Sequence, residues 1–236
     1  MRLIGVLLVL VACHDPAGSV TPPTDSRMPP GEDVPTAQTQ GVFVNWDIRP
    51  SLPAQVSGQM TVTDVLLQVS NLQLVSDAGA DESTTRSTYQ LHWTEGMDPP
   101  QDTFPDAPVA LYQKMLLFVA PPAFQTSAYQ ISGTWKDGGS NGGQEKPFLI
   151  IDQNGFKSSI NCNMVLPAGS SITTGIQVDL RDVFDNIDLS KVPSNDGVIT
   201  LDHGNQLDMV RMRLQSAFNL AGGNTSGGGG SSSPGT

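Results

Sequence analysis

From residue 41 onward, short runs of apolar side chains alternate with polar ones along the chain. In STYQLHW (residues 87–93), an aromatic or aliphatic side chain stands at every second position, with Gln90 and His92 between them. This two-residue period predicts a β-strand that buries one of its faces.

Segments of this kind follow one another at fairly regular spacing, separated by turns rich in Gly, Pro, Asn or Asp. No repeat of fixed length is visible, which argues against a solenoid or a propeller. We therefore predict a mainly β fold, an antiparallel β-sandwich of the immunoglobulin-like or jelly-roll-like kind, with one or two short helices near the C-terminus. The expected strands span 41–48, 59–75 (one bulged strand, or two strands), 87–93, 112–120, 127–135, 146–152, 157–166 and 171–180.

The apolar spacing changes near the C-terminus, where helices are expected. In residues 181–190 the apolar positions suit one or two helical turns. In residues 205–220 the apolar side chains fall on one helical stripe, with Asn205 as a candidate N-cap and Gly222 as a stop. Part of that second segment also alternates with a two-residue period, so a strand is the alternative there.

The first residues have the pattern of a targeting signal. Arg2 precedes an apolar run over residues 3–11, which is too short for a membrane-spanning helix because a span takes about 20 residues. The run ends in Leu10-Val11-Ala12-Cys13, which resembles a bacterial lipobox. An ordinary secretory signal with an incidental cysteine is the alternative.

The lipobox resemblance implies a lipid anchor on Cys13. In that pattern the thiol receives a diacylglyceryl group, a peptidase cuts just before the cysteine, and the new amine is acylated, with palmitate as a typical chain. Two or three acyl chains hold a domain on a membrane where a single chain would let go. His14, in place of Asp, resembles lipoproteins that are sorted to the outer membrane.

Composition divides the chain into four expected parts. Residues 1–12 are the signal peptide, and residues 13–40, rich in proline and poor in apolar side chains, are a disordered tether with a reach of about 30 Å. Residues 41–221 are the β-sandwich domain. Residues 222–236 are mostly Gly and Ser and are expected to be a disordered tail.

Charge narrows the range of partners. The 236 residues include 12 Lys and Arg against 23 Asp and Glu, a formal net charge of −11. Nucleic-acid binding needs clustered basic side chains, so we expect no nucleic-acid partner. Only 15% of residues are charged, while 24 Gly and 18 Pro indicate many turns, which suits an exported β-protein.

Two cysteines in an exported chain normally suggest a disulfide. The lipobox resemblance implies that the Cys13 sulfur is acylated, so Cys162 would remain alone. In SINCNMVL the side chains of Ile160, Cys162 and Met164 share one face of the expected strand. Cys162 is therefore predicted to be a buried thiol that packs as a small hydrophobic group.

Few other residues suggest chemistry. His14, His92 and His203 are too scattered for a metal site, and no zinc-protease, redox-dithiol or serine-hydrolase motif is present. We predict no catalytic residue, no metal and no cofactor. Trp93 and Trp135 are most simply core residues of a sandwich. As an alternative, they and an Arg86-containing loop are considered as the lining of a binding surface.

Two acidic clusters support further alternatives, although neither matches an EF-hand loop. The alternatives are a calcium-stabilised, adhesin-like domain, and an envelope glycan hydrolase that uses two facing acids from the second cluster. The simpler interpretation is that both clusters are exposed to solvent. They comprise Asp77, Asp81 and Glu82, and then Asp179, Asp182, Asp185 and Asp188.

The segments SDAGADESTTRSTYQLHW, FPDAPVALYQKMLLFV, LPAGSSITTGIQVDLRDVFDNIDLS and NQLDMVRMRLQSAFNL resemble a broad group of uncharacterised bacterial lipoproteins. The resemblance implies an exported β-domain and supplies no catalytic position. The expected function is that of a lipid-anchored envelope lipoprotein, in the periplasm or at the outer membrane, with a non-catalytic binding or structural domain. Expected partners are the membrane, through Cys13, and an envelope protein or glycan.

Overall fold

The computed structural model describes residues 41–105, 107–123, 125–138 and 143–221. The expected signal peptide, tether and tail, and the lipobox with Cys13, lie outside the described residues. The expected sandwich domain is the part that the structure describes.

The described chain consists mostly of strands, with two helices in its last third. The elements are β1 (Gly41–Arg49), β2 (Ala54–Gln55), β3 (Met60–Ser76), β4 (Gly79–Thr94), β5 (Asp102–Phe104), β6 (Ala110–Val119), β7 (Tyr129–Lys136), β8 (Glu145–Asp152), β9 (Phe156–Leu166), β10 (Ser171–Asp179), α1 (Leu180–Phe184), β11 (Ser194–Asn195), β12 (Val198–Leu201), α2 (Asn205–Ser216) and β13 (Phe218–Leu220).

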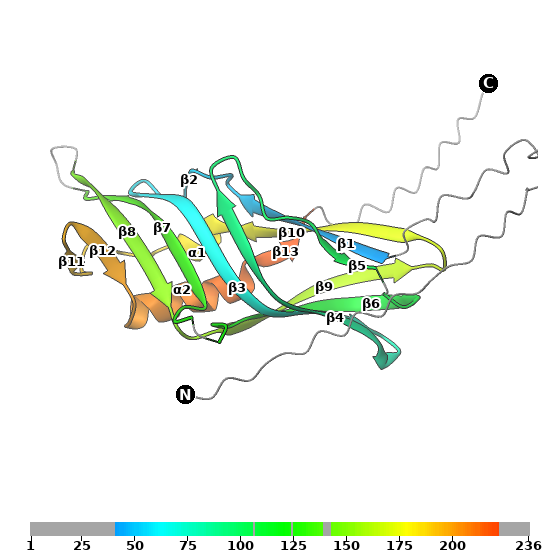
Figure 1. The fold of residues 1–236 in the computed structure, drawn as a ribbon. Coiled ribbons are helices and arrows are strands. Elements are labelled where there is room, and N and C mark those ends of the chain that lie inside the picture. Colours follow the sequence, from blue (N-terminus) through cyan, green and yellow to red (C-terminus); the bar gives the residue numbers. More distant parts are fainter. Residues whose placement is uncertain (1–40, 106, 124, 139–142, 222–236) are drawn as a thin grey trace, which may run out of the picture. The chain divides into compact units, whose positions relative to one another are not determined.

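The strands form two sheets that pack on one another (Figure 1). The smaller sheet has the order β13-β10-β1-β5, and the larger has the order β11-β12-β8-β7-β3-β6-β9, with β2 and β4 also paired to β3. The predicted mainly β sandwich with short helices near the C-terminus is confirmed. Both sheets are mixed, however, because β1 pairs in parallel with β10 and β8 pairs in parallel with β12.

The long strand β3 is where the larger sheet divides. One of its edges pairs with β4, and the other pairs first with β7, over 60–67, and then with β6, over 69–76. Between these stretches the Gln68 N–H donates to the Ala128 carbonyl (2.8 Å), and the Gln68 carbonyl accepts from the Ala120 N–H (3.0 Å). The choice between one bulged strand and two is therefore resolved in favour of one strand whose register shifts between partners.

Alternation along the strands separates core from surface. It is complete in β9, where buried and exposed side chains alternate over all 11 residues. Cys162 lies on the buried face of β9 with Ile160 and Met164, as predicted. Trp93 and Trp135 are only 0% and 4% exposed, which confirms that they are core residues and rules out the alternative that they line a binding surface. Their register in β4 and β7 places them in the core although they stand near strand ends.

The first predicted helix has the shorter of its two expected lengths. Helix α1 covers one turn, and it begins directly after β10. The carboxylate of Asp179 caps it by accepting a hydrogen bond from the Arg181 N–H (2.9 Å). Because this side chain satisfies a free N–H group at the helix start, the strand can pass directly into a helix.

The second helix confirms the helical interpretation of residues 205–216 but differs at both ends. Gly204 occupies the N-cap position without a side-chain hydrogen bond, so the prediction of Asn205 as the cap is wrong. At the other end the helix stops at Ser216, and Phe218–Leu220 turns back as β13. Pairing with the edge of β10 satisfies the β13 backbone, which local helical spacing could not reveal.

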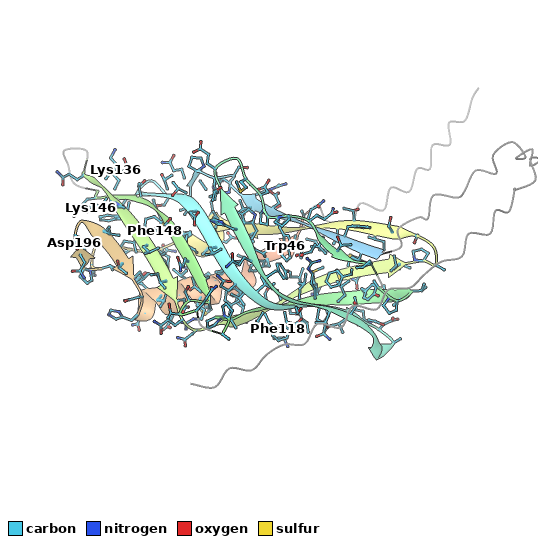
Figure 2. All side chains as sticks on the ribbon, viewed as in Figure 1. Trp46, Phe118, Lys136, Lys146, Phe148 and Asp196 are labelled. Atoms are coloured by element: carbon cyan, nitrogen blue, oxygen red, sulfur yellow. The ribbon has the colours of Figure 1, made fainter. Side chains whose placement is uncertain are left out.

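A buried aspartate on β5 connects the two sheets. The carboxylate of Asp102 accepts a hydrogen bond from the indole N–H of Trp46 (2.7 Å) on β1, and it pairs with the Arg86 guanidinium (2.9 Å) on β4. Trp46 is labelled in Figure 2. Arg86 also donates to the Thr103 carbonyl (3.2 Å) and lies over the Tyr89 ring. Burial raises the pKa of Tyr89, and the negative charge of Asp102 raises it further. Arg86 is therefore a strand residue that bridges the sheets, and its predicted place on a binding loop is wrong.

Within the described ranges, neither helix is long and apolar enough to cross a bilayer.

Candidate functional site

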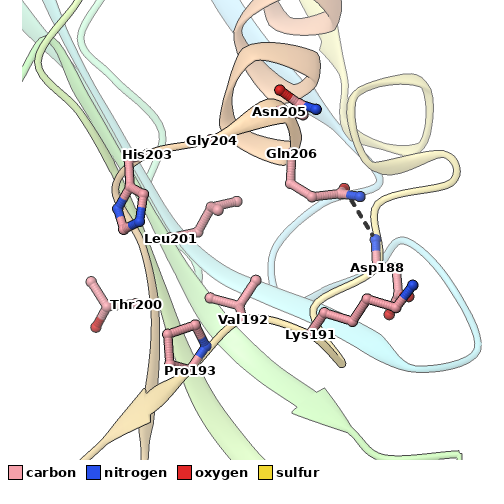
Figure 3. A pocket seen from close by; sticks show the side chains of 10 residues that line it. All are labelled: Asp188, Lys191, Val192, Pro193, Thr200, Leu201, His203, Gly204, Asn205 and Gln206. Carbon is pink, nitrogen blue, oxygen red and sulfur yellow. Dashed lines mark hydrogen bonds between the residues drawn. The ribbon is translucent and has the colours of Figure 1, made fainter.

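A pocket with a cavity volume of about 460 Å³ opens beside the N-terminus of α2 (Figure 3). Three segments form it: the turn that follows α1, strand β12, and the first residues of α2. We call it the α2 pocket. Its lining residues are Asp188, Lys191, Val192, Pro193, Thr200, Leu201, His203, Gly204, Asn205 and Gln206.

The α2 pocket combines an apolar lining with a polar rim. Val192, Pro193 and Leu201 supply apolar surface; Leu201 is 4% exposed, and Val192 packs against the core. Lys191 and Asn205 add an ammonium and an amide group to the lining. A concave apolar surface with a few polar groups is the usual form of a small-molecule site.

The acid and the imidazole of this pocket are engaged in local contacts. The Asp188 N–H donates to Gln206 Oε1 (3.4 Å), and the Asp188 carboxylate accepts from the Ser190 N–H (2.9 Å). Hydrogen bonds from Ser190 hold the pKa of Asp188 below its usual value, and the Lys191 charge contributes less. His203 Nδ1 contacts the carboxylate of Asp202, next to it in the chain. These contacts shape the pocket, and the Lys191 charge acts on Asp188 across it.

A buried ion pair holds α2 against the larger sheet. Asp152, at the end of β8, is 1% exposed, and its carboxylate accepts two hydrogen bonds from Arg211 on α2, at Nε (2.5 Å) and at an Nη atom (2.9 Å). The Asn154 N–H donates to the same carboxylate (2.8 Å). Arg211 also pairs with the exposed Asp208 (3.0 Å). The two-point contact fixes both the position and the direction of the helix whose start forms the pocket.

Tyr129 lies beside this ion pair. The side chain is fully buried, and its ring makes an edge contact with the ring of Phe156 (centroids 6.0 Å apart). Burial disfavours the charged phenolate, and the negative charge of Asp152 disfavours it further, so both raise the pKa of Tyr129.

The second acidic cluster does not form a cleft of facing carboxylates. Asp182, Asp185 and Asp188 are exposed, as the simpler interpretation predicts, and Asp179 is the cap of α1. Asp188 is the single member of the cluster in the α2 pocket. Asp185 lies 3.8 Å from Arg213 in a surface pair. The observations therefore do not favour the hydrolase alternative that uses this cluster.

The first acidic cluster is only partly within the described side chains. Asp77 is exposed in the turn between β3 and β4, whereas the side chains of Asp81 and Glu82 lie outside the described part. Among the side chains that the structure describes, no group of three or more His, Cys, Asp or Glu is arranged to hold a metal ion.

The remaining candidates have structural surroundings. His92 is exposed on β4 and lies 2.8 Å from the Asp64 carboxylate on β3. The buried Cys162 is a free thiol, and its Sγ donates to the Tyr112 carbonyl (3.2 Å). Burial raises the pKa of Cys162, which keeps the reactive thiolate scarce.

Sequence reasoning missed the residues that organise this site. Asp152 follows the apolar run of β8 and precedes a turn, so it has the appearance of an ordinary turn residue. Arg211 lies on the predicted helix, where a basic side chain suggests solvent. Two features of the sequence could have indicated this ion pair. One is an aspartate directly after an apolar run, and the other is an arginine beside the apolar stripe of the helix.

Comparisons with known proteins add no homologue. No family model matches the chain, and no curated protein or solved structure shows a significant match to it.

The raised pKa of Tyr129 predicts a loss of stability in alkali. Tyr129 has its ordinary pKa of 10.0 when unfolded but stays protonated in the folded state, so its contribution is complete below pH 10 and is lost as the pH rises further. The free energy of unfolding should fall by about 1.4 kcal/mol per pH unit for this group. Denaturant titrations between pH 8 and about pH 11 should show a shallower decline for Tyr129→Phe. A slope equal to that of the unsubstituted protein would contradict this assignment.

Proposed function

We propose that this chain is a bacterial envelope lipoprotein, anchored through lipid on Cys13, whose sandwich domain binds a small molecule in the α2 pocket and is non-catalytic. The apolar run before Cys13, the lipobox resemblance and the proline-rich segment over 13–40 support the anchor and tether. His14 favours the outer membrane as the place of residence.

The α2 pocket carries the binding proposal. Its apolar residues offer surface to the nonpolar part of a ligand, and Lys191 and Asn205 offer hydrogen-bond donors at the rim. Asp188 and His203 are the lining residues best suited to acid–base chemistry, and each already contacts a neighbour in the chain. This arrangement suits recognition of a small amphipathic molecule better than proton transfer.

The lipid anchor predicts that Cys13→Ser releases the protein from membranes. Without the thiol no diacylglyceryl group can be attached, and the remaining sandwich has no acyl chain to hold it. Cell fractionation should move the variant from the membrane to the soluble fraction, with an unchanged melting temperature. Cys162→Ser is the matched control, and it should stay with the membranes. A Cys13→Ser variant that still fractionates with membranes would contradict the anchor.

The binding site predicts that blocking the α2 pocket removes ligand binding. A mixture of small amphipathic fragments should shift the backbone NMR signals of Val192, Gly204 and Gln206. Thr200→Trp places a large ring at the pocket and should weaken fragment binding about tenfold or more, equivalent to about 1.4 kcal/mol. Thr134→Trp, at a half-exposed threonine of β7 outside the pocket, is the control. Fragments that leave these signals unchanged, or that bind Thr200→Trp normally, would contradict the site.

A further inference from the structure

A second pocket lies where β1 and β10 end. These neighbouring strands run in parallel, with Arg49 beside Asp179 at their C-terminal ends. Beyond that point the chains separate: β1 leads to β2, which pairs in the larger sheet, whereas β10 passes into α1. A crevice of about 450 Å³ remains between the two exits, lined by Arg49, Pro50, Ser51, Gln177, Asp179 and Arg181. We call it the arginine pocket.

The two cations of the arginine pocket come from different exits. Arg49 ends β1, and Arg181 lies on α1. The nearby acids are already engaged: Asp47 accepts from Arg49 Nε (3.0 Å), and the Asp179 carboxylate accepts from the Arg181 N–H (2.9 Å). The Arg181 guanidinium and the Nη groups of Arg49 have no partner among the described residues.

This lack of a partner for Arg181 is unusual in this chain. Within the described ranges, the other arginines each lie within 4 Å of a carboxylate, as the pairs Arg49–Asp47, Arg86–Asp102, Arg211–Asp152 and Arg213–Asp185. The chain carries 23 acidic residues against 12 basic ones, so carboxylates are plentiful. An unpaired guanidinium that lines a pocket is therefore a candidate ligand-binding group.

We propose that the arginine pocket binds a phosphate group. Guanidinium groups bind phosphate through paired, charge-assisted hydrogen bonds. Arg49 and Arg181 come from different elements, and Ser51 and Gln177, which also line the pocket, carry a hydroxyl and an amide that can donate. Donors from several directions suit a tetrahedral anion with four oxygens better than a planar carboxylate. The site is separate from the α2 pocket and does not depend on the ligand proposed there.

The phosphate has two possible sources at an envelope, a soluble phosphate compound or a phospholipid headgroup. Both are tested with the full chain carrying Cys13→Ser, so that no attached lipid contributes. Inorganic phosphate is titrated by calorimetry, and vesicles of phosphatidylglycerol are tested by co-sedimentation beside vesicles of phosphatidylcholine. We expect saturable phosphate binding at one site. Retention on phosphatidylglycerol vesicles that Arg181→Gln abolishes would identify the headgroup as the source.

Three variants decide whether the arginine pocket is responsible. Arg49→Gln and Arg181→Gln should each weaken phosphate binding about tenfold or more. Lys136→Gln removes an equal charge at the end of β7 (Figure 2) and should bind as the parent does. Absence of binding to both probes would overturn the proposal. Equal weakening by all three variants would also overturn it, because general charge would then explain the binding.

Discussion

The ion pair between Asp152 and Arg211 is the contact on which the arrangement around α2 depends. Asp152 is almost completely buried, so its charge would be costly without a partner, and Arg211 supplies two hydrogen bonds to it. The buried side chains Leu207, Val210 and Leu214 bind α2 to the core through nonpolar contacts. Such contacts are not directional, whereas the two-point ion pair permits one orientation of the helix. The position of the α2 pocket follows from that orientation.

Asp102 has a corresponding role between the sheets. It accepts from Trp46 in the smaller sheet and pairs with Arg86 in the larger one. Both buried aspartates also lie beside a tyrosine whose pKa they help to raise, Tyr89 for Asp102 and Tyr129 for Asp152. Although the chain has many acidic residues, these two are buried, and each has an arginine from a different element. They position layers that the nonpolar core alone would allow to slide.

The sequence predicted the parts of the fold that local patterns control. Alternation of apolar and polar side chains predicted the eight longest strands and the buried face that holds Cys162. The apolar stripe at helical spacing predicted α2. The parallel pairing of β1 with β10 joins residues about 130 positions apart, so no local pattern could indicate it. The short strands β2, β5, β11, β12 and β13 were missed because two to four residues carry too little periodicity. Trp93 and Trp135 show that register, and not nearness to a strand end, decides burial.

The candidate sites were less predictable than the fold. Both pockets form where chain segments separate, after α1 and β12 in one case and after β1 and β10 in the other. Their lining residues, such as Lys191 and Arg181, are ordinary surface residues in the sequence. The proposed lipid anchor rests on a sequence pattern, whereas the two proposed binding pockets rest on the structure.

The most direct test of the role of Asp152 is native-state hydrogen exchange of α2 in Asp152→Asn. The substitution keeps the side-chain shape but removes the charge that pairs with Arg211, and Asp208→Asn, which alters the exposed partner of Arg211, is the control. We predict that the α2 amides of Asp152→Asn exchange about 10 to 100 times faster, while the amides of β3 and β7 change much less. The control should leave α2 nearly unchanged. Exchange of α2 that remains as slow as in the parent, or that accelerates equally in every strand, would contradict the role given to Asp152.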